Sequence, residues 1–144
     1  MNWNWKEEGF LTPPHEIELR QRLTVYRAWG GTASEGGSPH RPGVCYMLEN
    51  PFRRSEAEGY ASIFEWSNTA TFLTKFEVAP FTLIWVGKVH PGDWYNHSLG
   101  KPGSQIFVEK HFNRTHIRKI GQAERLENDL KGRFVAPNRA RLHS

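Results

Sequence analysis

Short runs of β-branched and aromatic residues recur along the whole of this 144-residue chain, and each run ends at glycine, proline or a polar cluster. Such runs are typical of β-strands. The clearest run, 71–78, alternates with a period of two, so that Phe72, Thr74, Phe76 and Val78 share one face. The pattern predicts six strands, at 23–29, 43–48, 71–78, 81–89, 104–109 and 116–121.

Helices are predicted at three other places. Residues 15–22 follow two prolines, which a helix tolerates at its start, and 53–64 repeats apolar side chains at helical spacing. A terminal helix is predicted at 124–130. Because strands dominate, the predicted fold class is α+β: two small packed antiparallel sheets, or one strongly bent sheet, with short flanking helices.

The length of the chain matches a single domain, 1–144. Residues 1–22 are expected to form an N-terminal helical lead-in, and 132–144 a basic C-terminal tail. No stretch reaches the roughly 18 apolar residues of a membrane-spanning helix, and the first residues lack the pattern of a signal peptide. The expected location is the cytoplasm, or a target cell entered without a classical signal peptide, and no membrane partner is expected.

Several chemistries find no support in the sequence. Cys45 is the only cysteine, which excludes an internal disulfide and a cysteine-based metal site. The seven histidines lack the clustered spacing that zinc requires, so no metal is expected. The chain contains neither a Gly-x-Ser-x-Gly nucleophile turn nor a Gly-x-x-x-x-Gly-Lys phosphate loop.

Arg27 is the strongest single candidate for ligand binding. It lies in a predicted strand that closes in Gly30 and Gly31. Its guanidinium offers a fixed fork of donors that matches phosphate geometry, and glycine lets backbone approach a ligand because it has no Cβ. The alternative interpretation is a solvent-facing arginine on an edge strand.

Three short motifs occur in a characteristic order. They are Tyr26-Arg27-x-Trp29-Gly30-Gly31, then Trp66-x-Asn68-Thr69, then Gly103-Ser104-Gln105-x-Phe107. In this order they resemble the ADP-ribosyltransferase-like toxin domains found at the C-termini of bacterial polymorphic toxins, a group that includes NAD-hydrolysing members. The resemblance spans about 24–109, most of the expected core.

The resemblance implies a substrate, partners and a site. NAD is the substrate, without a metal, and ADP-ribose passes to a macromolecular acceptor (protein or nucleic acid) or to water; an immunity protein is a further expected partner. A carboxylate or amide on the ribose stabilises the oxocarbenium-like sugar that forms. In the implied site, Arg27 binds phosphate or ribose oxygens, with Gly30 and Gly31 beside it. Tyr46 or Trp66 borders the nicotinamide, together with Asn68 and Thr69. Gln105 and Glu109 contact the ribose.

The ribose-binding role stays open between two residues. Gln105 occupies the position that the resemblance gives, whereas Glu109 is the only carboxylate in the run 104–109. Their spacing of four puts both on one face of a regular strand. The Glu-x-Glu or Gln-x-Glu spacing typical of the superfamily is missing. An amide cannot deprotonate an acceptor, which favours hydrolysis or transfer to a group that is already nucleophilic.

Two rival functions compete with NAD cleavage. A small basic ribonuclease toxin would use His111, Arg114, His116 and Arg118 as acid, base and phosphate clamp. A non-enzymatic module would bind nucleic acid or protein through the basic C-terminal third, where nine Lys or Arg face three Asp or Glu from Lys110 onward and the whole chain carries +4.

Overall fold

The structure is a computed structural model that describes residues 4–6, 10–35, 43–61, 68–89, 104–109 and 116–129. The elements in this part of the chain are β1 (His15–Glu18), β2 (Leu23–Gly31), β3 (Gly43–Met47), α1 (Arg54–Ala61), β4 (Asn68–Val78), β5 (Leu83–Lys88), β6 (Ser104–Glu109) and β7 (Ile117–Arg125). Each of the six predicted strands has its counterpart among β2 to β7, and the expected dominance of β-structure is confirmed.

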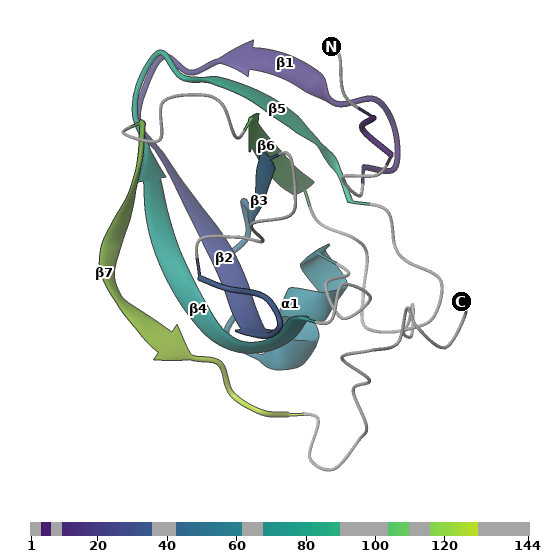
Figure 1. Cartoon of the computed structure of the whole chain (residues 1–144), viewed down its shortest axis with the longest axis vertical. Helices are drawn as coiled ribbons and strands as arrows, with labels where there is room; N and C mark the ends of the chain where they lie inside the picture. Colours follow the sequence, from purple (N-terminus) through teal and green to yellow (C-terminus); the bar gives the residue numbers. More distant parts are fainter. Residues whose placement is uncertain are drawn as a thin grey trace.

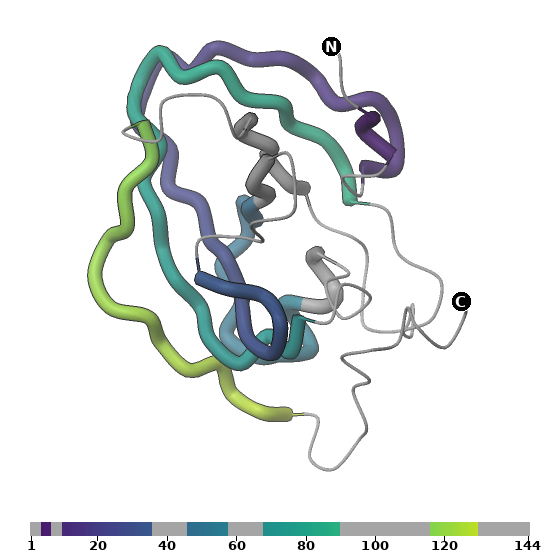
Figure 2. The backbone as a smooth tube through the Cα atoms, viewed as in Figure 1, coloured from purple at the N-terminus to yellow at the C-terminus, as the bar shows by residue number. Residues whose placement is uncertain are grey.

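Every neighbouring pair of strands is antiparallel, and the order across the sheet is β1-β5-β6-β3-β2-β4-β7. Figures 1 and 2 show how strongly this sheet bends: β1 and β5 arch over the top, while β4 and β7 run down one side. We call β1, β5, β6 and β3 the first limb, and β2, β4 and β7 the second limb. The limbs meet at one register pair, Tyr26 with Met47. The fold is therefore two antiparallel sheets joined into one bent sheet, with little helix.

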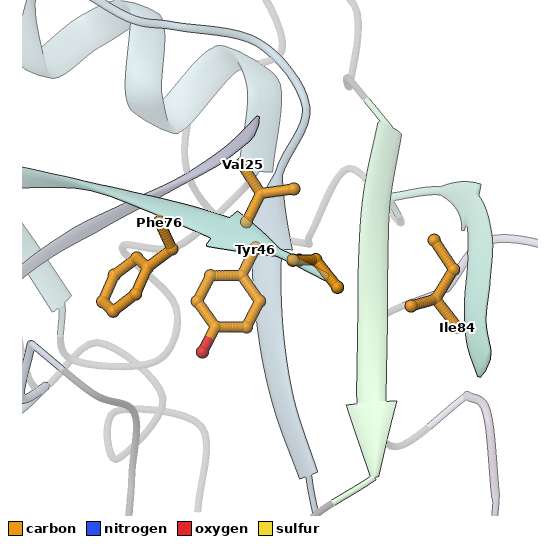
Figure 3. Close-up of a cluster of buried hydrophobic side chains, with 5 residues drawn as sticks. Val25, Tyr46, Phe76 and Ile84 are labelled. Atoms are coloured by element: carbon orange, nitrogen blue, oxygen red, sulfur yellow. The ribbon is translucent and has the colours of Figure 1, made fainter. Parts of the chain in front are cut away.

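An apolar core fills the angle between the limbs (Figure 3). Val25, Phe76 and Val78 come from the second limb, and Tyr46 and Ile84 from the first. The rings of Tyr46 and Phe76 meet edge to face, with 5.2 Å between their centroids. Because the ladder between the limbs has a single pair, burial of these side chains is the main force that holds the limbs together.

A smaller cluster covers the opposite face of the first limb. Trp85 follows Ile84 on β5 and so points away from the core. It packs with the buried Phe10, and Trp5 and Leu83 pack against both. The described part of the N-terminal segment is thereby fastened to β5.

Helix α1 begins with a cap built from two distant segments. The Glu56 carboxylate accepts the backbone N–H groups of Phe52 and Arg53, at 3.1 and 3.0 Å, which is the return half of a capping box. Asp129 supplies the other half, since it accepts the backbone N–H of Ser55 at 3.1 Å and also the Ser55 hydroxyl. Burial raises the pKa of Asp129, but the bonds from Ser55 and the charge of Arg53 outweigh burial and lower the pKa overall.

Two predicted helices are wrong. Residues 15–18 form the edge strand β1, because their backbone pairs with β5 from His15 to Glu18. The expected helical lead-in therefore contains a strand. At the other end, Glu124 and Arg125 extend β7, and the residues 126–129 are not helical. Their backbone is engaged elsewhere, since the N–H of Leu126 donates to the carbonyl of Thr71 at 2.9 Å.

The remaining helix and strands differ from prediction only at their ends. Strand β4 begins at Asn68 rather than at residue 71, and β7 runs on to Arg125. The predicted start of β5 at Phe81 is a turn in which Phe81 has a φ of 67°. Residues 62–67, 90–103 and the tail 132–144, for which predictions were also made, lie outside the described residues.

Candidate functional site

Arg27 lies on the inner face of the second limb, directly beyond the core. Alternation along β2 gives Val25, Arg27 and Trp29 the same face, and Val25 belongs to the core between the limbs. Strand β2 is central, with β3 on one side and β4 on the other. The alternative interpretation put Arg27 on an edge strand, and that placement is wrong.

The guanidinium of Arg27 is held in place by the segment that follows its own strand. Its Nε donates to the carbonyl oxygen of Ser34 at 3.1 Å, and the side chain is half-buried. Across the ladder, Arg27 is in register with Thr74 of β4. A cation fixed in this way, between two sheets, suits recognition of a phosphate.

Gly30 and Gly31 shape the return of the chain toward Arg27. Gly30 has a φ of 146° and Gly31 a φ of 63°. A Cβ on Gly30 would clash with Thr69 Oγ1 and would lie 2.9 Å from Thr71 Oγ1, so a larger residue would force these threonine side chains to move. Gly30 and Ala33 then exchange two backbone hydrogen bonds of 3.1 Å. The glycine was expected to let a ligand approach, but in this structure β4 approaches it instead. The turn brings residues 32–35 back over the sheet.

A continuous chain of polar contacts crosses the inner face beside Arg27. Trp29 Nε1 donates to Thr74 Oγ1 at 2.9 Å, and Thr74 Oγ1 donates to Glu35 Oε2 at 2.9 Å. Lys119 Nζ of β7 lies 3.3 Å from Glu35 Oε1. This chain joins β2, β4, β7 and the segment after β2. Sequence reasoning missed Glu35, since only the topology brings it next to Thr74 and Lys119.

An aromatic wall lies on the same face. The rings of Trp29 and Phe72 are 4.7 Å apart at their centroids, and the Arg125 guanidinium stands 5.0 Å over the Phe72 ring. The face therefore combines three basic side chains, Arg27, Lys119 and Arg125, with flat π surfaces. An anionic ligand that carries an aromatic ring matches both features.

Tyr46 lies deeper than the rest of the predicted site. It is 3% exposed and belongs to the core cluster, where its ring packs against Phe76. A side chain this deep supports the floor of a site beside Arg27, because little of its surface is left for a ligand.

Asn68 and Thr69 hold the start of β4 against its neighbours. The buried Asn68 donates from Nδ2 to the carbonyl of Ala28 at 2.8 Å and accepts the N–H of Ala70 at 2.8 Å. The carbonyl of Thr69 accepts Arg54 Nε at 2.8 Å. Ala70 has a φ of 51°, so these bonds hold it in a left-handed conformation that alanine rarely adopts.

Gln105 and Glu109 are placed by the register of β6. Gln105 pairs with Met47 of β3, which in turn pairs with Tyr26 of β2, whereas Glu109 pairs with Gly43. The row of Gln105 thus reaches β2 one residue before Arg27. Across the sheet, Gln105 is therefore aligned with Tyr26 and not with Arg27. Trp66 lies outside the described residues.

Among the residues that the structure describes, no group of three His, Cys, Asp or Glu side chains is close enough to hold a metal ion. The one helix in that part of the chain is not long and apolar enough to cross a membrane.

No protein-family model and no curated protein matches this sequence. The solved structure of Tne2 in complex with Tni2 matches it with a TM-score of 0.52 at 15% identity, over 85% of this chain and 98% of that chain. This chain shares the fold of Tne2. The match confirms, at the level of the fold, the resemblance to the ADP-ribosyltransferase-like toxin domains. The structure of Rhs1-CT in complex with its cognate immunity protein RhsI1 gives a lower TM-score of 0.44 at 18% identity, over 79% of this chain and 82% of that chain.

Proposed function

We propose that this protein is a toxin-like enzyme that breaks the nicotinamide–ribose bond of NAD and passes ADP-ribose to water or to a macromolecular acceptor. The observation that carries the proposal is the position of Arg27 on a central strand, at the inner face of two antiparallel sheets that share the fold of Tne2. The described residues of the three motifs lie on that same strand and on β4 and β6.

The inner face supplies what binding of NAD requires. Arg27 is assigned to a phosphate, because its held guanidinium presents donors in a fixed geometry. Lys119 and Arg125 add positive charge for the second phosphate, and the Trp29–Phe72 wall offers a surface for one of the two rings. These side chains contribute mainly by binding and orienting NAD, so that its scissile bond is placed for attack.

Cleavage breaks the bond between the nicotinamide nitrogen and the ribose carbon, and nicotinamide leaves with the bonding electrons. The ribose becomes oxocarbenium-like, and water or an acceptor adds to it and loses a proton. We assign the ribose contact to Gln105, with Glu109 as the alternative, and the border of the nicotinamide to Trp66. Tyr46, Asn68 and Thr69 are assigned supporting roles, since their observed contacts lie within the protein.

An immunity protein is the proposed partner. Tne2 was solved bound to Tni2, and a cell that makes an NAD-cleaving enzyme needs a protein that blocks it. We propose a corresponding inhibitor for this chain, together with delivery of the enzyme into a target cell.

The decisive experiment is incubation of the purified protein with NAD, followed by chromatography of nicotinamide and ADP-ribose. Equal release of both indicates hydrolysis, and nicotinamide in excess with labelled macromolecule indicates transfer. Arg27→Ala, which is expected to release much less nicotinamide, is measured beside the wild type. Breakdown of RNA without loss of NAD would reject the proposal in favour of a ribonuclease. Salt-dependent binding without turnover of either substrate would favour a binding module.

A further inference from the structure

We infer that Glu35 is a positioning residue for Arg27. Glu35 fastens the segment 32–35 to the sheet through Thr74 and Lys119. The carbonyl of Ser34, the residue before Glu35, is then fixed where it accepts Arg27 Nε. For its effect on NAD, the inference rests on the proposed function; for the orientation of the arginine, it rests on geometry alone.

The segment is anchored at two points, and Ser34 lies between them. The first anchor is the backbone pair of Gly30 and Ala33, with two hydrogen bonds of 3.1 Å. The second is the Glu35 carboxylate, whose two oxygens reach different strands: Oε2 reaches Thr74 on β4 and Oε1 reaches Lys119 on β7. Removing the second anchor loosens the segment directly after the Ser34 carbonyl.

Of the two contacts, the one with Thr74 is the stronger. Thr74 is fully buried, and its hydroxyl accepts from Trp29 while it donates to Glu35. Loss of the carboxylate leaves a buried donor unpaired, which costs more than the loss of an exposed contact. The ion pair with Lys119 is more exposed, at 45% for Lys119 and 32% for Glu35, so solvent weakens it.

The expected kinetic signature is a change of KM without a comparable change of kcat. A guanidinium that binds a phosphate acts on a part of NAD that does not react, so its contribution is similar in the ground state and the transition state. Disordering that guanidinium weakens binding in both states. A residue that takes part in bond cleavage would lower kcat instead.

The test compares Glu35→Ala, Glu35→Gln and Thr74→Val with the conservative Thr74→Ser. For Glu35→Ala and Thr74→Val, KM for NAD is expected to rise about tenfold while kcat changes less than about twofold. Glu35→Gln is expected to give an intermediate value, because its amide keeps an acceptor for Thr74 but loses the charge that attracts Lys119. Thr74→Ser keeps the hydroxyl and is expected to retain the wild-type KM. Glu18→Ala, on the exposed edge strand β1, is the matched control.

A second measurement does not depend on activity. The Nε–H of Arg27 gives a nitrogen-15 resonance whose exchange with water reports its bond to Ser34. Glu35→Ala is expected to speed this exchange about tenfold or more relative to wild type. Unchanged exchange in folded Glu35→Ala and Glu35→Gln would overturn the inference. If wild-type protein does not cleave NAD, the proposed function fails while the exchange rates still decide the role of Glu35.

Discussion

The two limbs of the sheet use their inner faces differently. The first limb gives Tyr46 and Ile84 to the core and carries a second apolar cluster on its other face. On the inner face of the second limb, Val25, Phe76 and Val78 belong to the core. Two residues farther along the same strands, on the same face, stand Arg27 and Thr74, and the polar chain begins. The candidate site is thus mounted directly on the packed core, which gives its side chains a rigid base.

The largest effect is expected where the limbs meet. Ile84→Ala should lower the free energy of unfolding by about 2–5 kcal/mol, because Ile84 is 1% exposed and its loss leaves a cavity. Ile17 is its register partner on β1 and is 42% exposed, so Ile17→Ala should cost only about 0.5 kcal/mol. Chemical denaturation measures both. Equal losses would show that packing between the limbs does not join them.

The second test asks whether the chemistry belongs to the inner face of the second limb. Arg27→Ala should lower kcat/KM for NAD about a hundredfold at an almost unchanged melting temperature. Arg27→Lys should recover little, since an ammonium lacks the planar fork. The matched control is Arg118→Ala, an exposed arginine of the same limb that pairs with Glu77 at 3.1 Å. Wild-type affinity for NAD in both Arg27 variants, measured by calorimetry, would reject the assignment.

A third test concerns the contribution of β6 in the first limb. Gln105→Ala is expected to lower nicotinamide release about tenfold or more, and Glu109→Ala to lower it less. The expected order follows the motif position of Gln105, whose row in the sheet contains Met47 and Tyr26, whereas Glu109 pairs with Gly43. Circular dichroism checks that both variants fold. If Glu109→Ala abolishes turnover and Gln105→Ala retains it, the carboxylate is the catalytic group.

The smallest effect is expected at the cap of α1. The pKa of Asp129 is below its ordinary value of 3.8 in the folded protein, so its stabilising effect is present above pH 3.8 and is lost as the pH falls through the lower folded pKa. Asp129→Asn should therefore destabilise the protein by about 1 kcal/mol at neutral pH. The difference from wild type should shrink in acid. Urea denaturation at several pH values tests this, with Glu124→Gln as an exposed control; a difference that is constant with pH would contradict it.

Sequence patterns predicted the strands that bury one face. The runs 23–29 and 71–78 were found because alternation and aromatic content both follow from burial against the core. Strand β1 was mistaken for a helix because all four of its residues are exposed, and its conformation depends on pairing with β5. The start of β4 was missed because Ala70 is left-handed and interrupts the alternation.

The candidate site was predicted only in part, for a reason of distance along the chain. Arg27 could be proposed from the sequence because its motif is local. Glu35 was missed because its partners Thr74 and Lys119 are 39 and 84 residues away. Local patterns contain no signal for such a contact, and it appears only when three strands and a turn are placed together.

The cap of α1 is divided between Glu56 and Asp129, and this division affects the order in which contacts can form during synthesis. This helix has eight residues, too few to persist alone in water, and its cap is Asp129, 74 residues beyond Ser55. Arg54, on the first turn, in turn holds the carbonyl of Thr69 at the start of β4. During synthesis, the Asp129 half of the cap and the pair of Lys119 with Glu35 can form only after β7 has been made. A nascent chain that stops short of β7 therefore lacks the Lys119 contact that helps to fasten the segment beside Arg27, and α1 has only the Glu56 half of its cap until Asp129 is made.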